Sequence, residues 1–158
     1  MTPETLFYIF IAIIIFHFLL GKILGYLNSN SQMQPIPEEG KGIYDDEKYK
    51  KSQEYHNESD RFGNIESFFG ITVMLTFFFL DGFAWLDGVV RNYTDEPLMI
   101  SLLFFFILAV ANDIISIPFD IYATFVIEEK YGFNKTTAKT FILDKIKGYF
   151  LMVILYLK

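Results

Sequence analysis

Residues 98–119 read LMISLLFFFILAVANDIISIPF, and the fold class can be inferred from these residues. Its 22 residues carry a single charged side chain, Asp113. A helix of this length extends over about 33 Å, which is enough to cross a hydrocarbon core of ~30 Å. The stretch therefore predicts a transmembrane helix.

Three other stretches of the chain are similarly apolar. Residues 6–27 and 65–86 are long enough for complete spans, and residues 149–158 are apolar for nine positions before Lys158. Nine helical residues reach only about 14 Å, so we expect the last stretch to be the truncated start of a fourth span. A soluble domain of 158 residues, 53% hydrophobic and 19% aromatic, would leave too much apolar surface in water. The prediction is an all-α, polytopic membrane helix bundle with three full transmembrane helices and the start of a fourth, in which residues 1–158 form one transmembrane domain.

The segments between the spans determine the predicted topology. Residues 28–64 and 120–148 hold five Lys or Arg each, whereas residues 87–97 hold one. The loops 28–64 and 120–148 must lie on the same side of the bilayer if all three spans cross it. Because Lys and Arg are enriched in cytoplasmic loops, we expect both to be cytoplasmic and the N-terminus to lie outside.

Both cytoplasmic loops are expected to contain helices. Residues 45–61 lack Pro and Gly and are charged throughout, which favours a water-exposed helix. Residues 138–149 have apolar side chains at helical spacing, which predicts an amphipathic helix at the interface, capped by Asn134 or Thr136.

Charge and composition exclude several function classes. A formal net charge of −6 argues against nucleic-acid binding, and the chain has no cysteine. Its two histidines, His17 and His56, lie in different segments and in no His-Glu-x-x-His pattern. The residues alone therefore indicate neither a catalytic centre nor a metal site, and the expected partner is the lipid bilayer.

Asn112 and Asp113 of the third span, together with Asp120 directly after it, are the candidate functional positions. An ionisable side chain in a spanning helix is costly and usually faces protein or a hydrated cavity. Asp120 follows Asp113 by seven residues, so it lies on nearly the same helix face, and Asn112 is adjacent. Two interpretations are open. The face lines a hydrated chamber or proton path, or Asp113 pairs with a lysine or accepts interhelical hydrogen bonds.

A more specific signal follows this span. The stretch Thr124–Thr136, TFVIEEKYGFNKT, resembles a signature of the CAAX prenyl protease 1 family, with Tyr131 where many members have histidine. Residues 82–91 (GFAWLDGVVR) and the polar loop 44–62 resemble the same family in the right order. The signature positions are Thr124, Phe125, Val126, Ile127, Glu128, Glu129, Lys130, Gly132, Phe133, Asn134 and Lys135.

The resemblance implies an integral-membrane zinc metalloendopeptidase whose helices surround a water-filled chamber. Family members hold zinc through His-Glu-x-x-His and a downstream Glu, C-terminal to the matched region. We therefore expect this chain to be the N-terminal transmembrane portion of such an enzyme, inactive alone and binding no zinc itself. The implied partners are a C-terminal catalytic half and prenylated or membrane-associated peptide substrates, in the endoplasmic reticulum membrane or a bacterial inner membrane.

The resemblance also assigns roles to individual residues. Asn112, Asp113 and Asp120 would line the chamber, and Glu128 and Glu129 would have a structural or substrate-facing role rather than forming a solvated turn. Two other functions remain alternatives. One is a non-catalytic membrane scaffold or binding protein, and the other is a small carrier or proton channel that uses Asp113 and Asp120.

Overall fold

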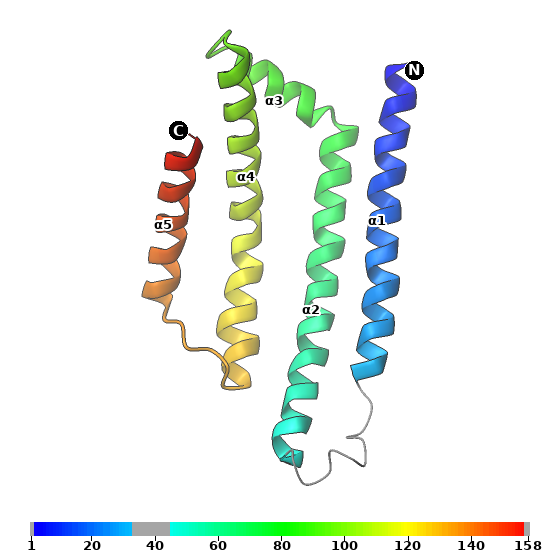
Figure 1. The fold of residues 1–158 in the computed structure, drawn as a ribbon, viewed down its shortest axis with the longest axis vertical. Coiled ribbons are helices and arrows are strands. Elements are labelled where there is room, and N and C mark those ends of the chain that lie inside the picture. The colour runs from blue at the N-terminus through cyan, green and yellow to red at the C-terminus, as the bar shows by residue number, and fades with distance from the viewer. Residues whose placement is uncertain (1, 33–44, 157–158) are drawn as a thin grey trace. The chain divides into compact units, whose positions relative to one another are not determined.

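A computed structural model describes residues 2–32 and 45–156 of the chain (Figure 1). Within these residues the structure is helical and contains no strand, which confirms the all-α prediction. Residues 33–44 of the expected polar loop and 157–158 of the expected fourth span lie outside the described residues. The elements are α1 (Pro3–Gln32), α2 (Asp46–Phe79), α3 (Gly82–Arg91), α4 (Pro97–Tyr122), the π-helical segment η2 (Ala123–Glu128) and α5 (Ala138–Tyr156).

Three helical stretches among the described residues are long and apolar enough to cross a membrane. They are Pro3–Ser29, Glu47–Phe79 and Pro97–Glu128, where the last combines α4 and η2. Each overlaps one of the three full spans expected from the sequence. The described part of the chain thus has the helices of a multi-pass membrane protein.

The boundary of the second membrane helix differs from the expected range of 65–86. Helix α2 ends at Phe79, and α3 begins at Gly82 after Asp81 adopts a left-handed conformation with φ 52°. A Cβ atom at Gly82 would overlap the ring of Phe77, so this close approach requires glycine. Trp85 consequently belongs to α3 rather than to the end of a membrane helix.

Hydropathy divides α2 and α5 into a polar and an apolar segment each, but in the structure each of them is one continuous helix. The charged helix expected at 45–61 is the first part of α2, and residues 138–149 and 149–158 belong largely to the single helix α5. No proline interrupts either helix, so the backbone continues where the side chains change from polar to apolar. A change in hydropathy therefore marks a change of environment, not the end of a helix.

The chain divides into two compact units, Met1–Leu75 and Thr76–Lys158. In the first unit, α1 and α2 are antiparallel (Figure 1), and Lys22 Nζ donates to Asn64 Oδ1 at 2.7 Å. The rings of Phe18 and Phe68 meet edge to face, with centroids 5.1 Å apart. No side chain that the structure describes in this unit is buried, which leaves apolar helix surface for lipid or other protein.

The second unit has a small apolar core. Leu86 and Val90 of α3 pack with Ile100 near the start of α4, and all three are buried. Their burial fixes α3 against the beginning of α4. Helix α5 lies beside α4 farther along (Figure 1), where the two helices contact each other through the polar residues described next.

Candidate functional site

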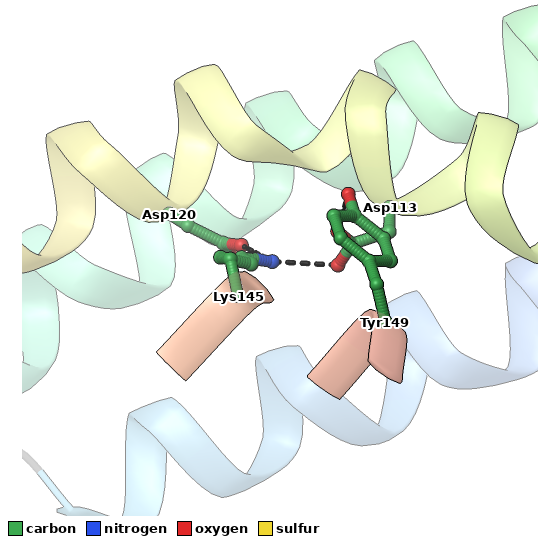
Figure 2. Close-up of polar contacts among 4 residues, drawn as sticks. All are labelled: Asp113, Asp120, Lys145 and Tyr149. Carbon is green, nitrogen blue, oxygen red and sulfur yellow. Dashed lines mark hydrogen bonds and ion pairs between the residues drawn. The ribbon is translucent and has the colours of Figure 1, made fainter. Parts of the chain in front are cut away.

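An ion-pair cluster joins α4 and α5. Lys145 Nζ lies 2.6 Å from Asp113 Oδ1 and 2.9 Å from Asp120 Oδ2, so one ammonium bridges two carboxylates. The hydroxyl of Tyr149 donates to Asp113 Oδ2 at 2.5 Å. Figure 2 shows Lys145 reaching from α5 to a point between the two aspartates of α4. We call these four residues the α4–α5 cluster.

Helical spacing explains how each helix contributes two side chains. Asp113 and Asp120 are seven residues apart, which is close to two turns, and they remain on one face although Pro118 lies inside α4. Lys145 and Tyr149 are four residues apart, so they are neighbours on α5. The sequence prediction that Asp113 and Asp120 share a face agrees with their common partner.

The electrostatics of the cluster suit a partly hydrated position. The side chains of Lys145, Asp113 and Asp120 are 24%, 30% and 39% exposed, so none of the three is fully buried. Mutual pairing lowers the cost of placing charges on a membrane helix. The arrangement matches the interpretation in which Asp113 pairs with a lysine, and two carboxylates against one ammonium leave a local formal charge of −1.

Of the three candidate residues, Asn112 lies outside the cluster, while two residues that were not candidates, Lys145 and Tyr149, belong to it. Asn112 is exposed and belongs to no contact of the α4–α5 cluster, although it is adjacent to Asp113. Lys145 and Tyr149 lie in the expected amphipathic helix or at its end, and the sequence pattern gives neither of them a functional role. Their i, i+4 spacing was a signal for a shared face, but only the contact between α4 and α5 identifies that face as the partner of Asp113.

The signature stretch ends the long helix formed by α4 and η2. Gly132 adopts a left-handed φ of 71°, its N–H donates to the Glu129 carbonyl at 3.0 Å, and the Phe133 N–H donates to the Glu128 carbonyl at 2.9 Å. These two hydrogen bonds form a Schellman motif, which stops a helix and satisfies its last carbonyls. Ile127 and Tyr131 are buried beside it. The signature therefore has a structural basis in a helix stop that only glycine adopts readily.

The rest of the signature forms the turn that leads into α5. Asn134 Nδ2 donates to Glu129 Oε2 at 2.9 Å, and Asn134 Oδ1 accepts the Thr136 N–H at 2.6 Å. The residue that caps α5 is Thr137, whose Oγ1 accepts the Thr140 N–H at 3.2 Å. The predicted cap at Asn134 or Thr136 was wrong because the Asn134 side chain stabilises the turn instead.

The zinc implied by the family resemblance has no ligand set among the described residues. No group of three or more His, Asp or Glu side chains in the described ranges is arranged to hold a metal ion. The carboxylates of the α4–α5 cluster are already occupied by an ammonium and a hydroxyl. The residues present do not provide a set of zinc ligands. We therefore assign no zinc-dependent reaction step to this chain.

Comparisons with known proteins agree on one family. Residues 25–157 match the family described as CAAX prenyl protease N-terminal, five membrane helices. The probable CAAX prenyl protease 1 of Schizosaccharomyces pombe is 37% identical over 116 residues, which cover 65% of this chain and 24% of that protein. The CAAX prenyl protease 1 homolog of Arabidopsis thaliana is 33% identical over 131 residues, covering 78% and 31%.

A solved structure shares the fold. The crystal structure of S. mikatae Ste24p has a TM-score of 0.83 and 26% identity, covering 98% of this chain and 37% of that one. The chain thus spans about a quarter to a third of the length of the curated relatives named above. It is a multi-pass membrane protein that belongs to the CAAX prenyl protease family and corresponds to the family's N-terminal membrane domain.

Proposed function

We propose that this chain is the N-terminal transmembrane portion of a zinc metalloendopeptidase and forms part of an intramembrane chamber. The reaction would be the hydrolysis of a peptide bond in prenylated or other membrane-associated peptides. The match of residues 25–157 to the family's N-terminal membrane domain carries the proposal. The named relatives are eukaryotic, which favours the endoplasmic reticulum membrane over a bacterial inner membrane.

The α4–α5 cluster supports a position on the chamber wall. A charged group facing lipid would lose its hydration, whereas a group facing a water-filled chamber keeps part of it. Asp113 and Asp120 are partly exposed and neutralised by one lysine, which suits a wall between water and protein. Asn112, next to Asp113, is exposed and would extend this polar wall.

The signature stretch would give the chamber a fixed shape rather than take part in catalysis. The carbonyl of Glu128 accepts a hydrogen bond in the helix stop, and the side chain of Glu129 accepts one from Asn134. Both residues therefore contribute to the turn that sets where α5 begins. The side-chain contact supports a structural role for Glu129 over a solvated acidic turn, and Glu128 contributes to the same turn through its backbone carbonyl.

Zinc and the catalytic groups would come from a catalytic half that this chain joins. In that arrangement the metal supplies a Lewis acid and an activated water, and this domain supplies the wall that positions substrate. The chain by itself would then bind no zinc and cleave no peptide. Its partners would be the catalytic half, the bilayer and the peptide substrate.

A chimaera tests this proposal directly. This chain would replace the matching N-terminal part of the S. pombe relative, and membranes from cells that lack their own enzyme would be assayed with a farnesylated CAAX peptide. We expect cleavage that a zinc chelator abolishes and added zinc restores. The matched control is the same chimaera with a substituted catalytic Glu in the relative's half.

A chimaera that inserts into membranes at the abundance of the parent enzyme, yet cleaves no peptide, would favour a non-catalytic scaffold. Cleavage by this chain expressed alone would show that the catalytic groups are not confined to the other half.

A further inference from the structure

A second feature lies in Thr76–Lys158, away from the α4–α5 cluster. A pocket of about 560 Å³ lies between α3, the turn that follows it and the first part of α4. This volume falls in the usual range for small-ligand sites, about 300–1,000 Å³. Four of its lining residues belong to the stretch 82–91. This stretch also resembles the family, but the function proposed above gives its residues no role.

The pocket is polar on one side and apolar on the other. Asp87 and Arg91 of α3 and Asp95 of the turn supply charges before α4 begins at Pro97. Phe104 and Phe105 line the pocket about two turns into α4, and Phe83 of α3 adds a third ring. Because α4 is part of a membrane-spanning stretch, the charges lie near the membrane surface and Phe105 lies ~12 Å farther along the helix. This polarity matches a lipid, with its headgroup at the charges and its chains along the rings.

The charges favour a headgroup that carries both signs. Arg91 Nε donates to Asp87 Oδ2 at 2.6 Å, and this contact raises the pKa of the Arg91 guanidinium, which stays cationic. A guanidinium has five N–H donors, so this bond leaves others for an anion. Asp95 is exposed and offers a carboxylate to a cation. Two carboxylates against one guanidinium disfavour a headgroup with net negative charge.

We propose that this pocket binds the headgroup of an ethanolamine phospholipid. Arg91 donates to the phosphate, and Asp95 accepts hydrogen bonds from the ammonium. A primary ammonium has N–H donors for a carboxylate, whereas choline has none and depends on aromatic faces. The rings here are phenylalanines, which are weaker cation–π partners than tryptophan.

Lipid retention measures this selectivity. The full chain would be placed in nanodiscs with equal amounts of ethanolamine, choline and glycerol phospholipids and then analysed by native mass spectrometry for bound lipid. We expect the ethanolamine lipid to be retained about tenfold over the glycerol lipid, since one charge-assisted hydrogen bond accounts for roughly that factor. Asp95→Asn should abolish this preference, whereas Arg91→Gln, which removes the donor to the phosphate that all three lipids share, should lower the retention of all three.

Matched variants separate this site from general charge effects. Glu96→Gln removes the neighbouring carboxylate, which does not line the pocket, and Arg61→Gln removes the other arginine of the chain. Both should keep the ethanolamine preference. Equal retention of all three lipids, a preference for the choline or glycerol lipid, or the same loss in Glu96→Gln as in Asp95→Asn would each overturn the proposal.

Discussion

Lys22 of α1 and Lys145 of α5 are both lysines on largely apolar helices, but they meet different partners. Lys22 Nζ donates to a neutral amide, Asn64 Oδ1, and lies 5.3 Å from the centroids of Phe18 and Phe68. Lys145 instead lies between two carboxylates at 2.6 and 2.9 Å. Each contact is a polar link between two helices of its own unit.

The difference follows from where the charges lie along the helices. Lys22 is seven residues from Ser29, the end of the first spanning stretch, so its ammonium is close to the interface and needs no counter-charge. Asp113 lies in the middle of the stretch Pro97–Glu128, where an unpaired carboxylate is costly. The comparison indicates that the two aspartates need Lys145 as a counter-ion, whereas Lys22 neutralises no carboxylate in its contact with Asn64.

The largest expected effect comes from removing Lys145. Lys145→Met leaves two carboxylates without a counter-ion, which should lower the free energy of unfolding by about 2 kcal/mol, less than for a fully buried pair because the groups are partly exposed. Unfolding of the full chain in detergent, titrated with a denaturing surfactant, measures this. The control is Lys147→Met, because Lys147 is 70% exposed and pairs with Asp144 at 3.5 Å. Equal losses in the two variants would contradict the comparison.

The next effect concerns the turn that places α5. Gly132→Ala forces a Cβ into a left-handed conformation, which should cost about 1–2 kcal/mol and loosen the approach of Lys145 to Asp113. Hydrogen exchange of the α5 amides, together with the unfolding titration, would report both changes. Gly148→Ala is the matched control, since it lies within α5 and an added Cβ there has no neighbour within 4 Å. If both variants behaved alike, the helix stop would not position α5.

A smaller effect is expected at the other lysine. Lys22→Met removes a hydrogen bond to a neutral group and leaves no unpaired charge, so the free energy of unfolding should fall by only ~0.5–1 kcal/mol. A double-mutant cycle with Asn64→Leu isolates the contact itself. A loss as large as that of Lys145→Met would show that the two lysines are equivalent after all.

The smallest effect should come from Tyr149→Phe. The ring stays in place and only the hydroxyl that donates to Asp113 is lost, while Lys145 still bridges both aspartates. In the same unfolding titration, we expect a lower free energy of unfolding than in the unmodified chain, but a smaller decrease than in any of the three variants above. Combining Tyr149→Phe with Lys145→Met should give less than the sum of the two decreases, because both act through Asp113. Strict additivity would place Tyr149 outside the cluster.

The helices, their membrane character and the family follow from the sequence without any tertiary contact. Length and hydropathy identify spanning segments because the bilayer demands about 20 apolar residues whatever the tertiary contacts are. The spacing of Asp113 and Asp120 placed them on one face, since helical periodicity is a local property. The stretch Thr124–Thr136 indicated the family, because its residues recur as a pattern in the sequence alone.

The contacts between helices, in contrast, are known from the three-dimensional structure alone. Lys145 is 32 positions from Asp113, and no local sequence pattern predicts which face of α5 contacts α4. The close approach of Gly82 to the ring of Phe77 after the helix break is a tertiary contact, and the cap at Thr137 follows from the use of Asn134 in the preceding turn. Hydropathy also separated the two parts of α2 and of α5, because it records the environment of the side chains and not the continuity of the backbone.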